Sequence, residues 1–245
     1  MISAYLQGGL GNMMFQIATA YAVAKDNDTD FCILEGQQYA PFGNNSVETY
    51  RDNILKNVSF GLSLPDFPLL RESTHGYIKI PELDEVLLYG YFQSEKYFKH
   101  HRDSLLDFFD CPRNKVKNNN VSMHVRRGDY LQIPEALPTQ SEEYYREALS
   151  RIGEYEELYI FSDDISWCKE TFSDLDAIYQ DTNKDHEDLY LMMQQRYHIL
   201  ANSSFSWWGA WLAQTDGMVI YPKLWFGIKG PDTSKDIPAE GWIGL

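Results

Sequence analysis

The chain has 245 residues, and its 21 Lys plus Arg against 36 Asp plus Glu give a formal net charge of −15. This acidic balance argues against a protein that coats nucleic acid or an anionic membrane, because no surplus of cations exists to neutralise phosphates. A hydrophobic content of 44% and an aromatic content of 15% supply enough core material for one large or two small domains, which argues against disorder.

The cysteines and histidines give no support to a disulfide framework or a structural zinc site. Cys32, Cys111 and Cys168 form no CxxC pair, and among six histidines only His100 and His101 are adjacent. The opening MISAYL lacks the features of a signal peptide, and no apolar window is long enough to cross a bilayer. We therefore expect a reduced, soluble, cytoplasmic protein with no integral membrane segment, with peripheral membrane association as an alternative.

The first part of the chain mixes strand and helix patterns with a loop-rich region. In chain order the pattern predicts a strand at 2–6, a glycine-rich loop at 7–12, a helix with apolar positions 14, 17, 18, 21 and 22, strands at 31–34 and 86–91, and a helix from Ser94, as its cap, to Phe109. Residues 36–80 are rich in Gly, Pro and Asn, which predicts long loops. This first domain is predicted to span residues 1–112.

The polar run RNKVKNNN at 113–120 is the predicted linker to a second domain at 121–245. There the pattern predicts strands at 121–126, 158–161, 177–179, 198–201 and 218–221, and helices at 142–152, 165–172, 186–197 and 205–214. Strands that alternate with helices at this spacing predict parallel βαβ units with both sheet faces covered. The predicted fold class is α/β, with two nucleotide-binding-fold halves.

The segment MHVRRGDY at 123–130 brings a histidine and an arginine to the end of a strand. Strand alternation places His124 and Arg126 on one face and sends Arg127 to the other. Open α/β sheets bind ligands at the carboxyl ends of their strands, and the planar fork of Arg126 suits a diphosphate. The alternative is a structural arginine–aspartate pair, which we favour for Arg127 with Asp129.

Two further segments follow predicted strands in the same half. SSFSWWG at 203–209 predicts either a plain serine N-cap or an anion site at a helix N-terminus. FSDD at 161–164 places Asp163 where its carboxylate can accept both N–H donors of a guanine, or cap the helix that begins at Ile165. From physical chemistry alone, capping is the preferred interpretation of Asp163.

Three other patterns indicate a functional site less strongly. The loop at 7–12 could bring backbone N–H groups close to a phosphate or sugar, but the chain contains neither GxGxxG nor a P-loop motif. Asp-x-Asp pairs occur at 26/28, 28/30 and 174/176; we interpret them as solvated charge and predict no catalytic metal. Trp207, Trp208 and Trp211 stand at helical spacing, which favours a core cluster over a sugar platform.

Five segments together closely resemble glycosyltransferase family 11, the α-1,2-fucosyltransferases. They are GGLGNMMFQIATAYAVA at 8–24, GYFQSEKYF at 90–98, HVRRGDY at 124–130, FSDDISWCK at 161–169 and LMMQQRYHILANSSFSWWGAWL at 191–212, covering about a quarter of the chain. The resemblance implies a GT-B architecture, with two Rossmann-like halves and the active site in the cleft between them. It also implies metal-independent transfer of L-fucose from GDP-β-L-fucose with inversion.

Carried onto this sequence, the resemblance implies a set of site residues. Arg126 would bind the β-phosphate, His124 and Asp163 would recognise guanine, the N–H and hydroxyl groups of Ser204, Phe205 and Ser206 would contact the diphosphate, and Asn12 with Gly9 and Gly11 would face the diphosphate and fucose. Asp129, the acid inside a motif, is the candidate general base.

The resemblance also implies the partners: a GDP-sugar donor and a galactose-containing glycan acceptor, with no additional cofactor. The chain is short for the family and begins without a membrane anchor, which resembles a bacterial or viral member. Two alternatives stay open at this point, a transferase that uses another GDP-sugar and a non-catalytic nucleotide- or carbohydrate-binding protein.

Overall fold

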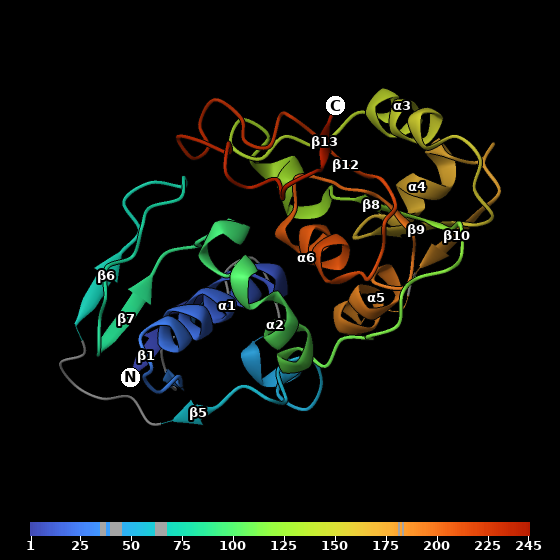
Figure 1. Ribbon diagram of the computed structural model, residues 1–245. Coiled ribbons are helices and arrows are strands. Elements are labelled where there is room, and N and C mark those ends of the chain that lie inside the picture. Colours follow the sequence, from blue (N-terminus) through green and yellow to red (C-terminus); the bar gives the residue numbers. More distant parts are fainter. Residues whose placement is uncertain (35–37, 40–45, 62–67, 181, 183) are drawn as a thin grey trace. The chain divides into compact units, whose positions relative to one another are not determined.

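A computed structural model describes residues 1–34, 38–39, 46–61, 68–180, 182 and 184–245 (Figure 1). The chain divides into two compact units. The first comprises Met1–Cys111 and Asp232–Ala239, and the second comprises Pro112–Pro231 and Glu240–Leu245. Asp232–Ala239 thus belongs with the first unit, whereas the sequence-based boundaries assigned it to the second half. The predicted linker is hydrogen-bonded within the second unit, for example from the Val116 N–H to the Gln214 carbonyl at 2.9 Å.

The first unit contains short parallel strands and one long helix. Its elements are β1 (Ile2–Ala4), β2 (Leu6–Gln7), α1 (Leu10–Asp26), β3 (Ile33–Leu34), β4 (Gln38–Tyr39), the 3-10 helix η1 (Val47–Tyr50), β5 (Phe60–Gly61), β6 (Leu69–Arg71), β7 (Val86–Tyr89), the 3-10 helices η2 (Glu95–Tyr97) and η3 (Lys99–His101), and α2 (Arg102–Phe108). A three-stranded parallel sheet runs in the order β1-β7-β6, and two parallel pairs join β2 to β4 and β3 to β5.

Helix α1 forms the centre of this unit. Met14, Phe15, Ile17 and Ala18 are fully buried, and burial extends around almost the whole helix as far as Ala24. The sequence predicted a single apolar face here. Burial on nearly all sides follows from the small and apolar residues that α1 carries around its circumference, since a helix that is apolar all round packs inside a domain.

The long helix predicted from Ser94 to Phe109 is wrong in its first half. Ser94 does act as a cap, since its Oγ accepts from the Lys96 N–H at 3.3 Å, but it caps η2. Phe98 then leaves helical geometry at φ −144° and is fully buried. Burying this ring interrupts the helix, and regular α structure begins only at Arg102. Of the predicted loop region at 36–80, residues 36–37, 40–45 and 62–67 lie outside the described residues, and the remainder includes the short elements η1, β5 and β6.

The second unit is a six-stranded, wholly parallel sheet with helices between its strands. Its elements are β8 (Val121–Val125), the 3-10 helix η4 (Gly128–Gln132), α3 (Glu142–Ile152), β9 (Leu158–Ser162), α4 (Ile165–Thr171), β10 (Ala177–Gln180), α5 (Asp185–Met192), β11 (Tyr197–Ile199), α6 (Ser204–Leu212), β12 (Val219–Tyr221) and β13 (Ile243–Gly244). The strand order is β10-β9-β8-β11-β12-β13. This is the strand order of a doubly wound α/β sheet.

The predicted alternation along β8 is confirmed on one face of the sheet. Val121, Met123 and Val125 join a buried cluster with Tyr145 of α3 and Cys168 of α4. Helices α5 and α6 pack against each other, and Figure 1 shows them on the side of the sheet opposite α3 and α4. Both faces are therefore covered, as the sequence pattern predicted.

Several other expectations have clear outcomes in the second unit. The three tryptophans of α6 are at most 5% exposed and their ring centroids lie 5.0–5.7 Å apart, so the prediction of a core cluster is confirmed. Helix α5 ends at Met192, well before the predicted end, because the chain enters β11 at Tyr197 to pair with Val121. β13, at the sheet edge, was not predicted.

Two whole-chain expectations also have outcomes. Cys32, Cys111 and Cys168 are not joined by a disulfide. Among the residues that the structure describes, no helix has the length and apolarity required to cross a membrane.

Candidate functional site

The sheet of the second unit has its switch point between β8 and β11. The chain proceeds from β8 outward through β9 and β10, and then returns to the other side of β8 as β11. In doubly wound sheets, ligands bind outside the carboxyl ends of the strands that flank this point. Residues 126–130 follow β8 and residues 200–206 follow β11. The motifs HVRRGDY and SSFSWWG therefore reach the same edge of one sheet.

Arg126 is the centre of a charged cluster at this edge. Its Nη2 donates to Asp129 Oδ1 at 2.6 Å, and its Nη1 lies 3.2 Å from Asp163 Oδ2. The guanidinium carbon lies 5.3 Å from the centroid of the Tyr130 ring. Burial lowers the pKa of Arg126, but the Asp163 and Asp129 carboxylates raise it by more, so the pKa rises above its ordinary value. The group keeps its positive charge in a half-buried position.

The predicted pairing of Arg127 with Asp129 is wrong. Arg127 Nε donates instead to Asp164 Oδ2 at 3.1 Å, and its guanidinium carbon lies 4.0 Å from the centroid of the Trp167 ring. Strand alternation explains the exchange, because it turns Arg127 away from the face that carries Arg126. Arg127 therefore binds Asp164 at the start of α4. Arg126 pairs with Asp129 and Asp163 at the carboxyl edge of the sheet.

The capping role predicted for Asp163 belongs to its neighbour. Asp164 is the N-cap of α4 and accepts from the Trp167 N–H at 3.1 Å. Asp163 uses Oδ1 to accept the Arg127 backbone N–H at 2.9 Å and places Oδ2 beside Arg126. Both oxygens of Asp163 thus tie the loop after β8 to the end of β9.

Gly128 provides the space for this arrangement. A Cβ on Gly128 would stand only 2.5 Å from Asp163 Oδ2, closer than any ordinary carbon–oxygen contact. Gly128 does not have a positive φ, so steric access rather than backbone conformation requires glycine here.

Tyr130 and Asn202 join the two loops of the switch point. The Tyr130 hydroxyl donates to the Asn202 carbonyl at 3.0 Å, and burial raises the pKa of Tyr130 to about 12. The Asn202 amide donates to the carbonyls of Pro138 and Trp225, each at 2.9 Å. The sequence interpretation missed both residues; an asparagine directly before the serine cap of α6 was the available signal.

The N-terminus of α6 lies in the second of these loops. Ser203 is the N-cap, and its Oγ accepts from the Phe205 N–H at 3.3 Å. Ser206 is buried and its hydroxyl donates to the Ser203 carbonyl at 3.3 Å. The plain capping interpretation is therefore confirmed for Ser203. The dipole of α6 adds a partial positive charge at the edge that carries Arg126.

His124 lies in β8, two residues before Arg126. Its ring centroid is 5.5 Å from that of Phe205, and the side chain is buried. Burial lowers its pKa to about 3, with a further contribution from the Arg126 charge, so the ring is neutral. Among the described residues its Nδ1 has no hydrogen-bond partner. The Arg126 charge thus acts on both Asp163 and His124.

The glycine-rich turn at residues 7–12 belongs to the first unit, and contacts within that unit fix its conformation. Gly8 has φ +81°, and a Cβ there would stand 2.3 Å from Asn12 Nδ2. Gly9 occupies the N-cap position of α1, and no side chain accepts a hydrogen bond from the first N–H groups of the helix there. Gln93 Nε2 donates to Asn12 Oδ1 at 2.8 Å. Gln93, from the GYFQSEKYF segment, is a third residue that the sequence interpretation missed.

Two of the aspartates interpreted as solvated charge have close partners. Asp26 contacts the Nε2 atoms of His100 and His101, and Asp174 accepts from both Nη atoms of Arg146 at 2.8–2.9 Å. Both carboxylates are also solvent-exposed, at 45% and 62% of the side chain, so they are solvated charges with ion-pair partners. Neither partner set could be read from the Asp-x-Asp spacing.

The comparison with known protein families decides the classification. A model of the family described as glycosyl transferase family 11 matches residues 1–245. The chain belongs to glycosyltransferase family 11. This match confirms the resemblance drawn from the five motifs and extends it over residues 1–245.

Proteins with similar sequences include bacterial and mammalian transferases. The chain is 33% identical to the α-1,2-colitosyltransferase of Escherichia coli, over 100% of this chain and 98% of that protein. It is 27% identical to the O-antigen biosynthesis glycosyltransferase WbnK of Escherichia coli, over 98% of this chain and 99% of that protein. It is 26% identical to the galactoside 2-alpha-L-fucosyltransferase SEC1 of Bos taurus, over 88% of this chain and 64% of that protein.

Solved structures with a similar fold include the fucosyltransferase NodZ from Bradyrhizobium. One NodZ structure matches 94% of this chain with a TM-score of 0.52 at 11% identity, covering 96% of NodZ. NodZ α-1,6-fucosyltransferase co-crystallised with GDP matches 88% of this chain with a TM-score of 0.51 at 12% identity, covering 94% of NodZ. At these identities the likeness concerns the fold. The predicted α/β class with parallel sheets is confirmed.

Proposed function

We propose that this family 11 member is an inverting transferase that moves L-fucose from GDP-β-L-fucose to a galactoside hydroxyl in α-1,2 linkage. The position of the Arg126 guanidinium is the observation that supports this proposal most directly. The guanidinium is a charged, half-buried fork held at the switch point of a nucleotide-binding sheet by two carboxylates. Names among the relatives supply the linkage, since the SEC1 enzyme is a galactoside 2-alpha-L-fucosyltransferase.

In the proposed step, the acceptor hydroxyl oxygen forms a bond to the anomeric carbon of fucose while the bond from that carbon to the β-phosphate oxygen breaks. GDP leaves with the bonding electron pair, and the acceptor proton passes to a general base. A single displacement converts a β donor into an α product. Negative charge grows on the leaving diphosphate, so donors fixed beside it stabilise the transition state more than the ground state.

Arg126 and the N-terminus of α6 are proposed to stabilise that charge. The Ser204, Phe205 and Ser206 N–H groups begin α6, and its dipole points its positive end toward the same edge. In the structure the Phe205 N–H donates to Ser203 Oγ and the Ser206 hydroxyl donates to the Ser203 carbonyl, so in this proposal both exchange these acceptors for phosphate oxygens when the donor binds. Diphosphate binding by protein groups alone is the basis for proposing a reaction that needs neither a metal nor another cofactor.

Guanine recognition is assigned to His124 and Asp163, and proton removal to Asp129. A carboxylate can accept from guanine N1–H and N2–H, and uracil presents no such pair of donors. Asp163 already holds Arg126 and the Arg127 N–H, so in this proposal it also positions the arginine. A GDP and UDP titration tests the base preference. Equal affinity for the two nucleotides contradicts this assignment.

The first unit is proposed to supply a second binding element at Gly9, Gly11 and Asn12. Helix α1 begins there without a side-chain cap, and Gly8 lets the turn pass close to Asn12. Asn12 is held by Gln93, so its amide keeps a fixed orientation. We further propose that the two units correspond to the two Rossmann-like halves of a GT-B enzyme.

A second donor is favoured by one observation, the 33% identity to an α-1,2-colitosyltransferase. Colitose differs from L-fucose by the absence of the 3-hydroxyl. A site that hydrogen-bonds this hydroxyl discriminates against the deoxy sugar by about 10⁴-fold, whereas an apolar contact at the same point discriminates weakly. The ratio of kcat/KM for GDP-fucose and GDP-colitose therefore decides between the two donors.

The test of the proposal is a panel of GDP- and UDP-sugars with galactoside acceptors, analysed by mass spectrometry. We expect a product from GDP-fucose or its 3-deoxy relative, with linkage assigned by NMR, and unchanged rates in EDTA. Restoration of an EDTA-abolished activity by Mg²⁺ or Mn²⁺ contradicts metal independence. Binding of GDP with neither transfer nor donor hydrolysis supports a non-catalytic binding protein instead.

A further inference from the structure

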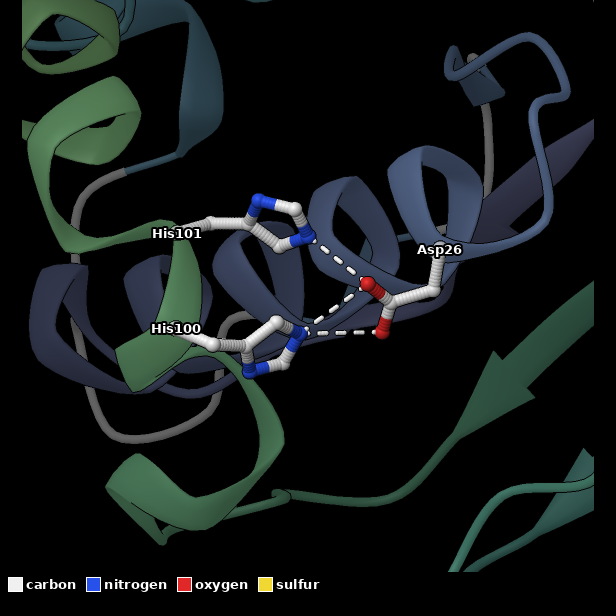
Figure 2. Close-up of side chains that lie close together, drawn as sticks. All are labelled: Asp26, His100 and His101. Carbon is white, nitrogen blue, oxygen red and sulfur yellow. Dashed lines mark hydrogen bonds and ion pairs between the residues drawn. The ribbon is translucent and has the colours of Figure 1, made fainter.

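Two histidines and one aspartate converge in the first unit, outside the residues used above. Asp26 is the last residue of α1, and His100 and His101 lie in η3, 74 and 75 residues further along the chain. Figure 2 shows both imidazole Nε2 atoms directed at the Asp26 carboxylate. His100 Nε2 is 3.0 Å from both oxygens, and His101 Nε2 is 2.8 Å from Oδ1.

We propose that these three side chains form a Zn²⁺ site that joins the end of α1 to η3. One ligand atom from each residue lies within 4.8 Å of the other two. A tetrahedral Zn²⁺ with bonds of about 2.0–2.1 Å separates neighbouring ligand atoms by about 3.3 Å. The present N–O distances are a few tenths of an ångström shorter, so small side-chain rotations admit the ion. Zn²⁺ binds the lone pair of each Nε2, so each neutral ring carries its one proton on Nδ1 instead, and water completes the coordination.

The surroundings favour a cation at this point. The C-terminal end of α1 carries the negative end of the helix dipole, which adds to the Asp26 carboxylate. Two imidazoles with one carboxylate suit Zn²⁺ and its transition-metal neighbours, whereas Mg²⁺ and Ca²⁺ prefer oxygen ligands. The ligands are also partly fixed in place: His101 packs edge-on against Tyr21 at 6.4 Å between centroids, and the two imidazole centroids lie 4.4 Å apart.

The role we assign to the ion is structural. Helix α1 has 17 residues, so Asp26 lies about 25 Å along the helix from the glycine-rich turn at its other end. The ion therefore does not contact the predicted phosphate-binding turn. It closes a long chain segment by joining α1 to the turn that leads into α2, and a ligand that binds only the folded protein raises the midpoint of thermal unfolding.

The test uses the full chain without a polyhistidine tag, stripped with EDTA and desalted, and titrated with ZnCl₂ by calorimetry. We expect one equivalent of Zn²⁺ to bind and to raise the midpoint of thermal unfolding, while MgCl₂ does neither. Asp26→Asn, His100→Asn and His101→Asn should each weaken binding by roughly tenfold or more, since even partners that only orient a ligand contribute 10- to 100-fold. Co²⁺ should give visible absorption bands that are lost in the variants.

The matched control is His186→Asn, because His186 lies beside a single aspartate, with Nδ1 3.8 Å from Asp185 Oδ1. It should bind Zn²⁺ as the parent does. Circular dichroism verifies that each variant is folded, and the half-exposed His100 offers a substitution that leaves the core intact. The proposal is overturned by an absence of saturable Zn²⁺ binding, by unchanged affinity in folded His100→Asn and His101→Asn, or by equal effects of Mg²⁺.

Discussion

Gly128 and Asp163 lie in such close contact that no larger residue fits at position 128 without moving the carboxylate. A Cβ would stand 2.5 Å from Oδ2, the oxygen that faces Arg126 Nη1 at 3.2 Å. The parallel register of β8 and β9 creates this contact, because Val125 pairs with Ser162 and the following residues of both strands meet. The glycine of the HVRRGDY motif therefore sets the position of its arginine through an aspartate on the next strand.

Gly128→Ala is expected to reduce transfer while the protein stays folded. The methyl group displaces Asp163, and Arg126 loses one of its two carboxylate partners. In a background of Asp163→Ala the same substitution should add little further loss, since the clashing group is gone; neighbouring residues that act together are not additive. Turnover of the two single variants and the double variant measures this coupling. Additive losses would show that Gly128 acts independently of Asp163.

Arg126→Lys is expected to keep its thermal midpoint nearly unchanged and to lose most of its transfer activity. A lysine ammonium cannot reproduce the two-pronged contact of the guanidinium with a phosphate. Removal of such a donor typically lowers the rate by about 100- to 1000-fold. Steady-state kinetics and GDP affinity provide the measurement. Wild-type turnover, or an unfolded variant, means that another cation stabilises the diphosphate.

Arg127→Lys provides the contrasting case within the same dipeptide. It should lose stability, because the contacts with Asp164 and the Trp167 ring depend on the planar guanidinium. The expected decrease in the free energy of unfolding is about 1–2 kcal/mol, since both partners are partly exposed. Denaturant unfolding gives this value, and GDP affinity measured on the folded variant should change little. A large loss of GDP affinity with unchanged stability would place Arg127 at the ligand.

Stability is expected to fall as the pH decreases below about 6.5. Burial lowers the pKa of His124 to about 3 and that of His198 to about 4, from an ordinary 6.5. The unfolded chain therefore binds protons before the folded protein does, so this stability is complete above pH 6.5 and is lost as the pH falls toward 4 and then 3.

Between pH 7 and pH 5.5 the two groups together account for about 2 kcal/mol. Urea unfolding at several pH values measures the slope. His198→Asn should reduce the slope over this range, because it removes one of the two groups that take up a proton on unfolding. An unchanged slope in that variant would assign the pH dependence to other groups.

Much of the second unit was predictable from the sequence. The period of apolar residues gave α3 with its observed bounds and the alternating strands and helices of a parallel sheet. These features depend on contacts between near neighbours in sequence. The burial of the α6 tryptophans also follows from local spacing, because a helix face with that much apolar area must be covered.

The choice of partners was decided by the tertiary structure. Arg126 takes Asp163 and Arg127 takes Asp164 because the register between β8 and β9 fixes which side chains meet, whereas the contact of Arg126 with Asp129 is local to the loop after β8. The sequence determined which residue types were present at the strand ends, and not how they pair. Asp26 meets His100 and His101 across more than seventy residues, a separation at which motif spacing carries no information and only the packing of α1 against the segment before α2 brings the three side chains together.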